Sequence, residues 1–157
     1  MFSADELFHT CARLGISLSP PPAPVANYIP YSFDGNILWI SGQLPFVDGK
    51  VILTGLVGGI VDPLEAASAA KIAAVNLLSQ VYVFLSQNNR SVKGCLRLGG
   101  FIASVPTFTG HSLVMNGASD LIADALAPHG RHARTSIGVA SLPLGAAVEV
   151  EGQFLIG

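Results

Sequence analysis

The C-terminal segment RHARTSIGVASLPLGAAVEVEG brings together residue types that can bind an anion and move a proton. It contains Arg131, Arg134, Glu149 and Glu151, which are two of the five arginines and two of the four glutamates of the chain. A guanidinium offers a planar pair of N–H donors to a carboxylate. A glutamate in a poorly hydrated pocket has a raised pKa and can act as an acid or a base near neutral pH. The segment therefore predicts a site that holds an organic acid and handles a proton or a water molecule.

The two glutamates alternate with valines, and this fixes how they point if the segment is a strand. Val148 and Val150 would then face one side of the sheet, while Glu149 and Glu151 would face the other. From the pattern alone, a solvated outer face is the more frequent explanation of such an alternation. If the strand that begins at Arg134 pairs with this one, the guanidinium could approach Glu149 or reach the cavity of a neighbouring subunit.

Three histidines, His111, His129 and His132, raise the question of a metal site. Arg131 and Arg134 lie beside them and would repel a cation. A His-x-x-His pair without a cysteine or an acidic partner is also a weak pattern for zinc. We therefore expect no metal.

Two further stretches lack the spacing that their chemistry would need. The glycine-rich segment 55–62 follows neither GxGxxG nor GxxxxGK[ST], so it does not predict a nucleotide site. Ser41 and Gly42 lie outside the G-x-S-x-G context of a nucleophile elbow. No cofactor is expected.

The chain is poor in charge for a soluble domain. Its 157 residues are 50% hydrophobic and 11% charged, against roughly 25% charged in an average domain. Eight basic and ten acidic side chains cover little of the surface of a monomer of this size. We therefore expect an oligomer that buries apolar surface between its subunits. The net charge of −2 provides no basic field for a phosphate backbone, which argues against a nucleic acid partner.

Three features bear on the compartment of the protein. Cys11 and Cys95 form no CxxC pattern and are typical of buried thiols in a reducing compartment, although one disulfide stays open as an alternative. Asp5 and Glu6 stand where a signal peptide would need a basic region and an apolar core. The most apolar long stretch, 72–87, is interrupted by polar residues and follows a helix cap, so we do not expect it to span a membrane. Together these features predict a cytoplasmic protein.

The N-terminal part predicts a short helix followed by an extended connector. Residues 3–16 have the pattern of an amphipathic helix, with Ser3 as N-cap and Glu6 in the position that completes a capping box. Gly15 is the expected stop. Residues 17–24 contain four prolines, so they can form neither a helix nor a central strand.

Two longer helices alternate with strand-like segments. The first helix covers 62–89, where Asp62 can cap the helix and Pro63 suits its first turn, and the second covers 114–130. The strand-like segments are 35–55, with a hairpin turn at Asp48-Gly49, then 93–104, 134–144 and 146–156. This order predicts an α+β fold with both helices on one face of a sheet and a partner subunit on the other.

Three stretches of the chain follow one known pattern. Residues 133–154 combine an arginine at a strand start, a Leu-Pro turn and a strand in which hydrophobic residues alternate with glutamates. Residues 26–45 place a tyrosine before a Gly-Asn turn and a strand end that reads Ser-Gly-Gln-Leu-Pro. Residues 62–81 form the long first helix, with Asn76 at the usual asparagine. Over 23–157 the chain thereby resembles the RidA/YjgF family of reactive-intermediate deaminases.

This resemblance implies a single α+β domain of chorismate-mutase-like (YjgF-like) fold, a mixed sheet with two long helices on one face. Residues 1–22 would add a short N-terminal helix and its connector, and 23–157 would form the domain. The resemblance also implies a homotrimer with small-molecule clefts between its subunits. In family members that are deaminases, an imine or enamine derived from an amino acid is hydrolysed there to a 2-keto acid and ammonia, with no metal or cofactor.

The resemblance also assigns roles to single residues. Arg134 falls on the arginine that grips the substrate carboxylate, and Glu149 falls on the carboxylate that positions the water and moves protons. The other positions expected to bind the substrate are Tyr28, Ser41, Gly42, Asn116 (the asparagine that opens the second helix) and Ser136. Ser136 departs from the family pattern because it replaces a cysteine: its backbone N–H can still serve the cleft, but no thiol chemistry is available.

Two other functions stay open at this point. A non-catalytic trimer could bind a small carboxylate or carbonyl metabolite in the same cleft, and it would need Arg134 but not Glu149. Endoribonuclease activity is attached by name to parts of the family, but the acidic balance and the absence of a basic stripe argue against it.

Overall fold

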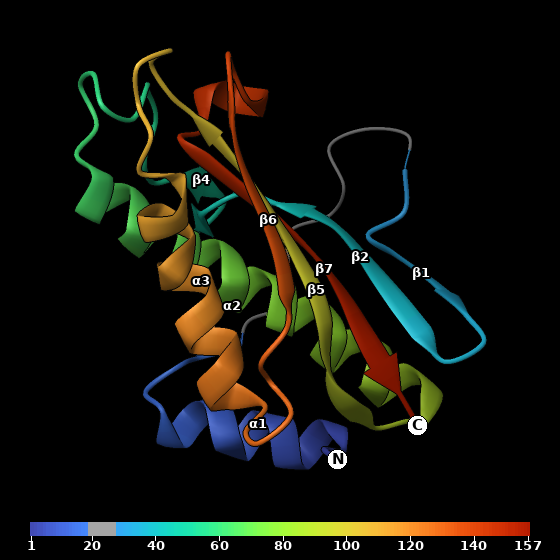
Figure 1. Ribbon diagram of the computed structural model, residues 1–157. Helices are drawn as coiled ribbons and strands as arrows, with labels where there is room; N and C mark the ends of the chain where they lie inside the picture. The colour runs from blue at the N-terminus through green and yellow to red at the C-terminus, as the bar shows by residue number, and fades with distance from the viewer. Residues whose placement is uncertain (19–27) are drawn as a thin grey trace.

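A five-stranded sheet lies at the centre of the protein (Figure 1). The computed structural model describes residues 1–18 and 28–157, so most of the predicted proline-rich connector lies outside the described residues. The sheet order is β1-β2-β7-β5-β6, in which β5 and β6 are parallel and all other neighbours are antiparallel. The strands are β1 (Tyr31–Asp34), β2 (Ile37–Gln43), β5 (Val92–Ala103), β6 (Ala133–Val139) and β7 (Val148–Ile156).

The two helices with capping signals begin where the sequence predicts. Helix α1 (Ala4–Arg13) starts after Ser3, whose hydroxyl accepts the Glu6 backbone N–H while the Glu6 carboxylate accepts the Ser3 backbone N–H. Helix α2 (Pro63–Asn88) starts after Asp62 with the same reciprocal capping box. Each box satisfies backbone donors that the first turn of a helix leaves without a partner.

The third helix, α3 (His111–Ala125), begins three residues before the predicted start at 114. Its N-cap, Gly110, makes no side-chain hydrogen bond, so no capping signal marks this end in the sequence. A short 3-10 helix, η1 (Pro143–Gly145), precedes β7.

Helices α2 and α3 cover one face of the sheet, and in the described part of the chain no helix covers the other face (Figure 1). Helix α1 packs against α2 and α3, with Leu7 and Cys11 fully buried in the common core. This layering confirms the predicted α+β fold with both long helices on one face. The division at residue 22 stays a prediction, because that position lies outside the described residues.

The contact between α2 and α3 is made by very small residues. A Cβ on Gly117 of α3 would overlap the carbonyl oxygen of Ala67 in α2, so the two backbones touch. The fully buried alanines of α2 are Ala66, Ala69, Ala70, Ala73 and Ala74. By length and composition α2 could cross a membrane, but most of its apolar stretch is buried inside this protein, as in the core helix of a soluble domain.

The predicted hairpin at Asp48-Gly49 forms, but it is a separate two-stranded unit. It joins β3 (Phe46–Val47) to β4 (Lys50–Val51), and Asp48 and Gly49 both have positive φ, as a type I′ hairpin turn requires. Strand β2 ends just before Leu44-Pro45, since a proline cannot donate to a sheet ladder. The hairpin partner of β2 is therefore not β4 but β1, which precedes it across a turn at Gly35.

The strand of Arg134 does not pair with the strand of Glu149. Strand β6 runs parallel to β5, and β5 separates it from β7. The reason lies in the chain path: α3 crosses over the sheet and returns the chain beside β5 in the parallel direction, while β7 occupies the other side of β5. Arg134 is therefore not brought to Glu149 by strand pairing.

Candidate functional site

The polar residues of β7 lie on the open face of the sheet. Along this strand fully buried residues alternate with half-buried ones, so Val148 and Val150 lie under the helices and Glu149 and Glu151 lie on the other side. The alternation expected from the sequence is confirmed. Both carboxylates consequently belong to the face that none of the described helices covers.

Glu149 lies directly against the backbone of the neighbouring strand β2. A Cβ on Gly42 would overlap the Glu149 carboxylate, so only a glycine leaves room for it there. Burial raises the pKa of Glu149, and the negative charge of Glu151 raises that pKa further. A carboxylate with a raised pKa exchanges a proton more readily near neutral pH, which is the property that acid–base catalysis needs.

Glu151 is paired with an arginine that the sequence did not point to. Arg97 Nη1 donates to Glu151 Oε1 at 3.2 Å, and its Nη2 donates to Thr135 Oγ1 at 3.2 Å. Both side chains of the pair are more than a third exposed, so the pair itself contributes only about 0–1 kcal/mol to stability. Its main effect is local, because the hydrogen bond from Arg97 fixes the position of the Glu151 carboxylate, whose charge raises the pKa of Glu149.

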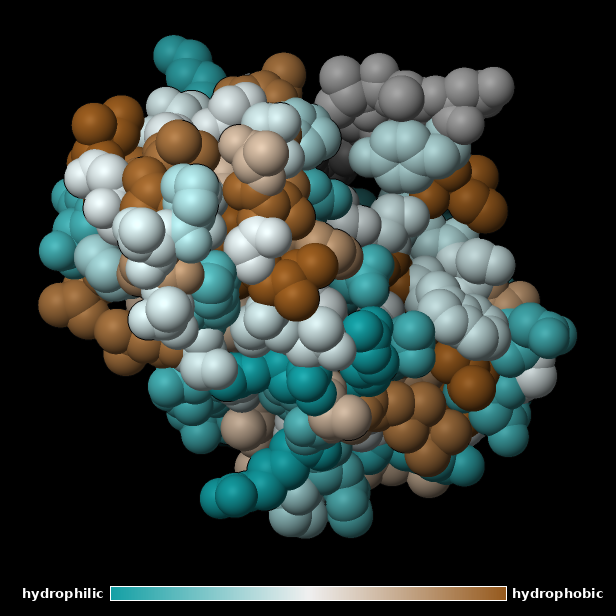
Figure 2. All heavy atoms as spheres, turned by 45° about the horizontal axis from the view of Figure 1, so that its top comes forward, coloured by the Kyte–Doolittle hydropathy of each residue, from teal (hydrophilic) through white to brown (hydrophobic). Residues whose placement is uncertain are grey.

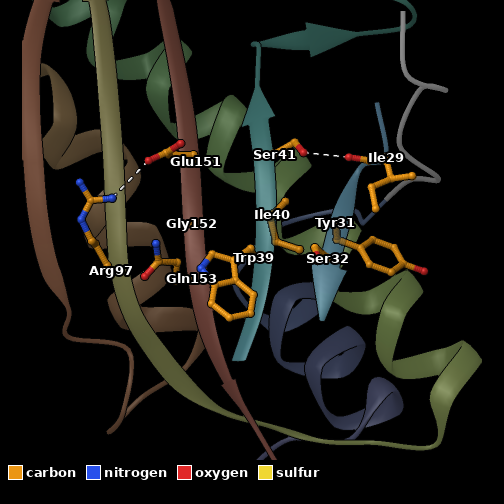
Figure 3. A pocket seen from close by; sticks show the side chains of 10 residues that line it. All are labelled: Ile29, Tyr31, Ser32, Trp39, Ile40, Ser41, Arg97, Glu151, Gly152 and Gln153. Atoms are coloured by element: carbon orange, nitrogen blue, oxygen red, sulfur yellow. Dashed lines mark hydrogen bonds and ion pairs between the residues drawn. The ribbon is translucent and has the colours of Figure 1, made fainter. Parts of the chain in front are cut away.

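A hollow of about 230 Å³ lies beside this ion pair on the open face. Figure 3 shows the Trp39 indole and the Gln153 amide on one side of it and the Arg97–Glu151 pair above them. Ser41 donates its hydroxyl hydrogen to the Ile29 carbonyl at 2.9 Å, which ties β2 to the segment before β1. The hollow thus has an aromatic wall and a charged wall.

One of the predicted binding residues, Ser41, belongs to this surface, and a second, Tyr28, precedes Ile29, which also lines the hollow. Ser41 lines the hollow, although its hydroxyl hydrogen is already donated within the chain. Tyr28 is half exposed at the start of the segment that leads into β1. Trp39, which also lines the hollow, was not predicted, because nothing in its local sequence separates it from a core residue.

Arg134 lies on the helix side of the edge strand β6. Its Nη1 donates to Asn116 Oδ1 at 3.0 Å and to Ser119 Oγ at 3.1 Å, and its Nη2 donates to the Ser112 carbonyl at 3.3 Å. The three acceptors are four and three residues apart, so they form one stripe along α3. The structure therefore brings Arg134 and Asn116 together, although Asn116 lies in the second turn of α3 rather than at its opening.

Arg134 keeps the capacity to bind an anion. Three of its five N–H donors are used by α3. Within residues 1–18 and 28–157 the only ion pair is that of Arg97 with Glu151, so Arg134 has no carboxylate partner there. Ser136, two residues further along β6, has a buried hydroxyl that makes no hydrogen bond within the same residues. A buried hydroxyl without a partner is rare enough to require an explanation, and a bound polar ligand would supply one.

The three histidines weighed as metal ligands lie apart. In the part of the chain that the structure describes, no group of three or more His, Cys, Asp or Glu side chains is placed to hold a metal ion. His132 contacts Ser119 and the Gly130 carbonyl, and His111 contacts Ser104.

Within one subunit, Arg134 and Glu149 cannot contact the same small ligand. Arg134 reaches α3 on one face of the sheet, Glu149 lies on the opposite face, and β5 runs between their strands. Figure 2 shows several groups of exposed apolar side chains between pale and hydrophilic residues on one face of the molecule. Among the large exposed ones are Ile29, Trp39 and Ile137.

The mixed sheet and the two long helices on one of its faces define a small α+β protein of the chorismate-mutase-like class. A family described as "YjgF/chorismate mutase-like, putative endoribonuclease" matches residues 10–151. The chain belongs to this family, which confirms the resemblance to RidA/YjgF proteins found in the sequence.

Two relatives that are more than 40% identical to this chain carry names that describe no activity. Protein TCP17 of Trypanosoma cruzi is 44% identical over 140 residues, which cover 88% of this chain and 87% of that protein. The crystal structure of Atu1372 from Agrobacterium tumefaciens, a protein of unknown function, has a TM-score of 0.88 at 43% identity and covers 98% of this chain and 94% of its own. A "putative endoribonuclease" from Shewanella oneidensis MR-1 has a TM-score of 0.87 at 28% identity, with 95% of this chain and 98% of that chain covered.

Proposed function

We propose that the protein hydrolyses 2-imino or enamine acids to 2-keto acids and ammonia, in clefts between the subunits of a cytoplasmic homotrimer. The observation that carries this proposal is the state of Arg134, which α3 holds in place while two of its five N–H donors have no partner among residues 1–18 and 28–157. Glu149, with its raised pKa, lies on the opposite face of the same sheet. In a closed symmetric assembly, the anion-binding surface of one copy can meet the acid–base surface of the next.

The chemistry needs orientation and a base, because an imine carbon is already electrophilic. Arg134 binds the substrate carboxylate through its remaining N–H donors, with the Ser136 hydroxyl beside it. Glu149 takes a proton from a water molecule while the water oxygen bonds to the imine carbon and the C=N electron pair moves to nitrogen. Glu149 then returns that proton to the nitrogen, which gives the neutral carbinolamine. In the second half Glu149 takes the proton of the carbinolamine hydroxyl and passes it to the amino nitrogen, while the C=O bond forms and the C–N bond breaks, so that the 2-keto acid and ammonia leave.

The remaining predicted residues have supporting roles in this scheme. Gly42 leaves space for the Glu149 carboxylate, and Ser41 fixes the strand end from which Gly42 comes. Asn116 holds Arg134. Tyr28 is half exposed and is free to contact a substrate or a neighbouring subunit.

The direct test measures ammonia or keto-acid release from 2-iminopropanoate and 2-iminobutanoate generated in situ. We expect turnover by the wild type, loss of turnover in Glu149→Gln, and a strongly raised KM in Arg134→Ala. A wild-type sample that is folded and oligomeric but inactive on both substrates would refute the deaminase function.

Mixing the two variants, at a substrate concentration too low for Arg134→Ala to turn over, tests the shared cleft. If each site uses Arg134 of one copy and Glu149 of the next, random reassembly of Arg134→Ala with Glu149→Gln subunits restores about one quarter of the sites. If both residues served a site within one copy, mixing would restore none. Recovery of activity upon mixing would therefore support the inter-subunit cleft.

A non-catalytic trimer that binds small carboxylates is the second candidate, favoured by the engagement of the Ser41 hydroxyl within the chain. It predicts that calorimetry finds a keto acid bound equally by wild type and Glu149→Gln, with no turnover by either. The endoribonuclease activity in the family description has less support, since the net charge is −2 and gives no basic field for a phosphate backbone. RNA cleavage that survives repurification and disappears in Arg134→Ala would be needed to favour it.

A further inference from the structure

One of the acceptors that hold Arg134 is itself held by a histidine. His132 Nε2 lies 3.1 Å from Ser119 Oγ, and His132 Nδ1 lies 2.6 Å from the Gly130 carbonyl oxygen. A carbonyl oxygen can only accept, so Nδ1 carries a proton. In the neutral ring Nε2 then accepts the Ser119 hydroxyl hydrogen, which leaves the lone pairs of Ser119 Oγ for Arg134 Nη1 at 3.1 Å. The hydrogen bonds thus run in one direction, from Arg134 through Ser119 and His132 to the Gly130 carbonyl.

We propose that His132 and Ser119 are positioning residues that fix the plane of the Arg134 guanidinium for its substrate. The inference rests on the proposed function for the identity of that substrate, but the geometry concerns only the arginine. Neither residue touches the reacting atoms in this arrangement, and both act through Arg134.

The physical reason is the freedom that each group would have without its partner. A serine within a helix can turn its hydroxyl to the carbonyl four residues earlier, which for Ser119 is that of Met115. Because His132 Nε2 accepts the Ser119 hydroxyl hydrogen, the hydroxyl does not turn to the Met115 carbonyl, and its lone pairs stay directed towards Arg134. A long arginine side chain loses substantial rotamer entropy when it binds, and holding it beforehand reduces that cost.

The hydrogen bonds from Arg134 through Ser119 to His132 lie at the surface, so each of them can be removed by substitution without unfolding the protein. Ser119, His132 and Arg134 line an open hollow of about 610 Å³ at the surface, together with Arg131, Asp120 and Asp124. None of the three is a core residue. Ser119→Ala and His132→Ala are therefore expected to fold. His129 is a matched control, since it is exposed and its ring makes no hydrogen bond with the described residues.

The first measurement follows the guanidinium N–H groups of Arg134 by ¹⁵N NMR in the wild-type protein and the variants. The chain has only five arginines, and Arg134→Lys identifies the signal. Since one hydrogen bond contributes about 1 kcal/mol, we expect Ser119→Ala and His132→Ala to speed N–H exchange of Arg134 about 5-fold. The double variant should show no further increase, because His132 acts through Ser119. His129→Ala should leave the signal unchanged.

The second measurement separates positioning from general stability. We expect both variants to raise KM for the imino acid and Kd for pyruvate about 5-fold, with kcat nearly unchanged, and Ser119→Thr to restore the wild-type values. If the wild type binds pyruvate without turnover, the deaminase function fails while Kd still decides this proposal. If it binds no pyruvate either, N–H exchange decides. The proposal is overturned if His132→Ala matches His129→Ala in exchange and affinity, or if the effects of the two variants add.

Discussion

Substitution of Gly42 by alanine offers the sharpest test of the role given to Glu149. The backbone of Gly42 is in a conformation open to any residue, so alanine introduces no strain of its own. The added methyl group would lie 2.7 Å from Glu149 Cδ and 3.0 Å from its Cγ, and it would overlap Oε1. Ordinary van der Waals contact begins at 3.4 Å. The carboxylate therefore has to move, by about the difference between 2.7 and 3.4 Å at its carbon atom.

A displacement of this size is large for a group that must meet a reacting water molecule. Misplacement by about 1 Å can lower a rate by about 100-fold, so we expect kcat of Gly42→Ala to fall by about 10- to 100-fold. KM should change little, because Arg134 on the other face of the sheet is untouched. The melting temperature should also change little, since the half-exposed Glu149 side chain can turn towards solvent.

The matched control is Gly99→Ala, in which the same methyl group meets Glu151 instead. That Cβ would lie 2.6 Å from Glu151 Oε1 and 2.7 Å from its Cγ, a displacement of the same kind on the neighbouring carboxylate. Steady-state ammonia release should show a far larger loss of kcat for Gly42→Ala than for Gly99→Ala. Equal losses, or full kcat in Gly42→Ala, would refute the assignment of Glu149 as the proton-transfer group.

Three further predictions concern charge and packing. Glu151→Gln removes one of the two causes that raise the pKa of Glu149, so the acidic limb of the pH–kcat profile should move to lower pH. Arg97→Gln removes a nearby positive charge and should move this limb to higher pH. If the limb stays in place in both variants, it reports the titration of another group. Because the native pKa of Glu149 is raised above its ordinary value of 4.5, the native state binds the proton more tightly than the unfolded state, and the free energy of unfolding falls as pH rises through that window. Glu149→Gln should therefore melt at or above the wild-type temperature at pH 7 and match it below pH 4.5, whereas a lower melting temperature at pH 7 would argue against the raised pKa. Gly117→Ala should force α2 and α3 apart at Ala67, which costs about 1–3 kcal/mol of stability. At roughly 2–4 °C per kcal/mol, the melting temperature of this variant should fall by several degrees, whereas that of Ser68→Ala, on the exposed side of α2, should stay at the wild-type value. Equal melting temperatures for the two variants would contradict the close contact.

Local signals in the sequence were sufficient for the elements they mark. The capping boxes at Ser3 and Asp62 locate the starts of α1 and α2, because both partners of each box lie within four residues. The alternation along β7 gives the face of Glu149 for the same reason. The order of the strands is not local, so the sequence suggested that β6 could pair with β7, whereas the crossover through α3 sets it beside β5.

The same distinction applies to the site. Arg134, Asn116 and Glu149 stand in recognisable motifs. The pairing of Arg97 with Glu151 depends instead on the register between β5 and β7, because these two residues are 54 positions apart in the chain. Ser119 could have been found from its spacing with Asn116 on α3. His132, by contrast, was considered only as a metal ligand, because its real partner becomes visible only when β6 is placed against α3.

The contact between Gly117 and Ala67 also determines how accurately Arg134 is held. Gly117 lies between Asn116 and Ser119 in the sequence of α3 and turns towards α2, while those two residues turn towards β6. A helix that touches its neighbour backbone to backbone has little freedom to roll or slide, unlike one that rests on adjustable side chains. The packing of α2 against α3 in the core thus fixes the position of the α3 residues that hold Arg134. Other residues that line the hollow beside Arg134 can therefore vary, and change what the protein binds, while the orientation of the arginine is kept.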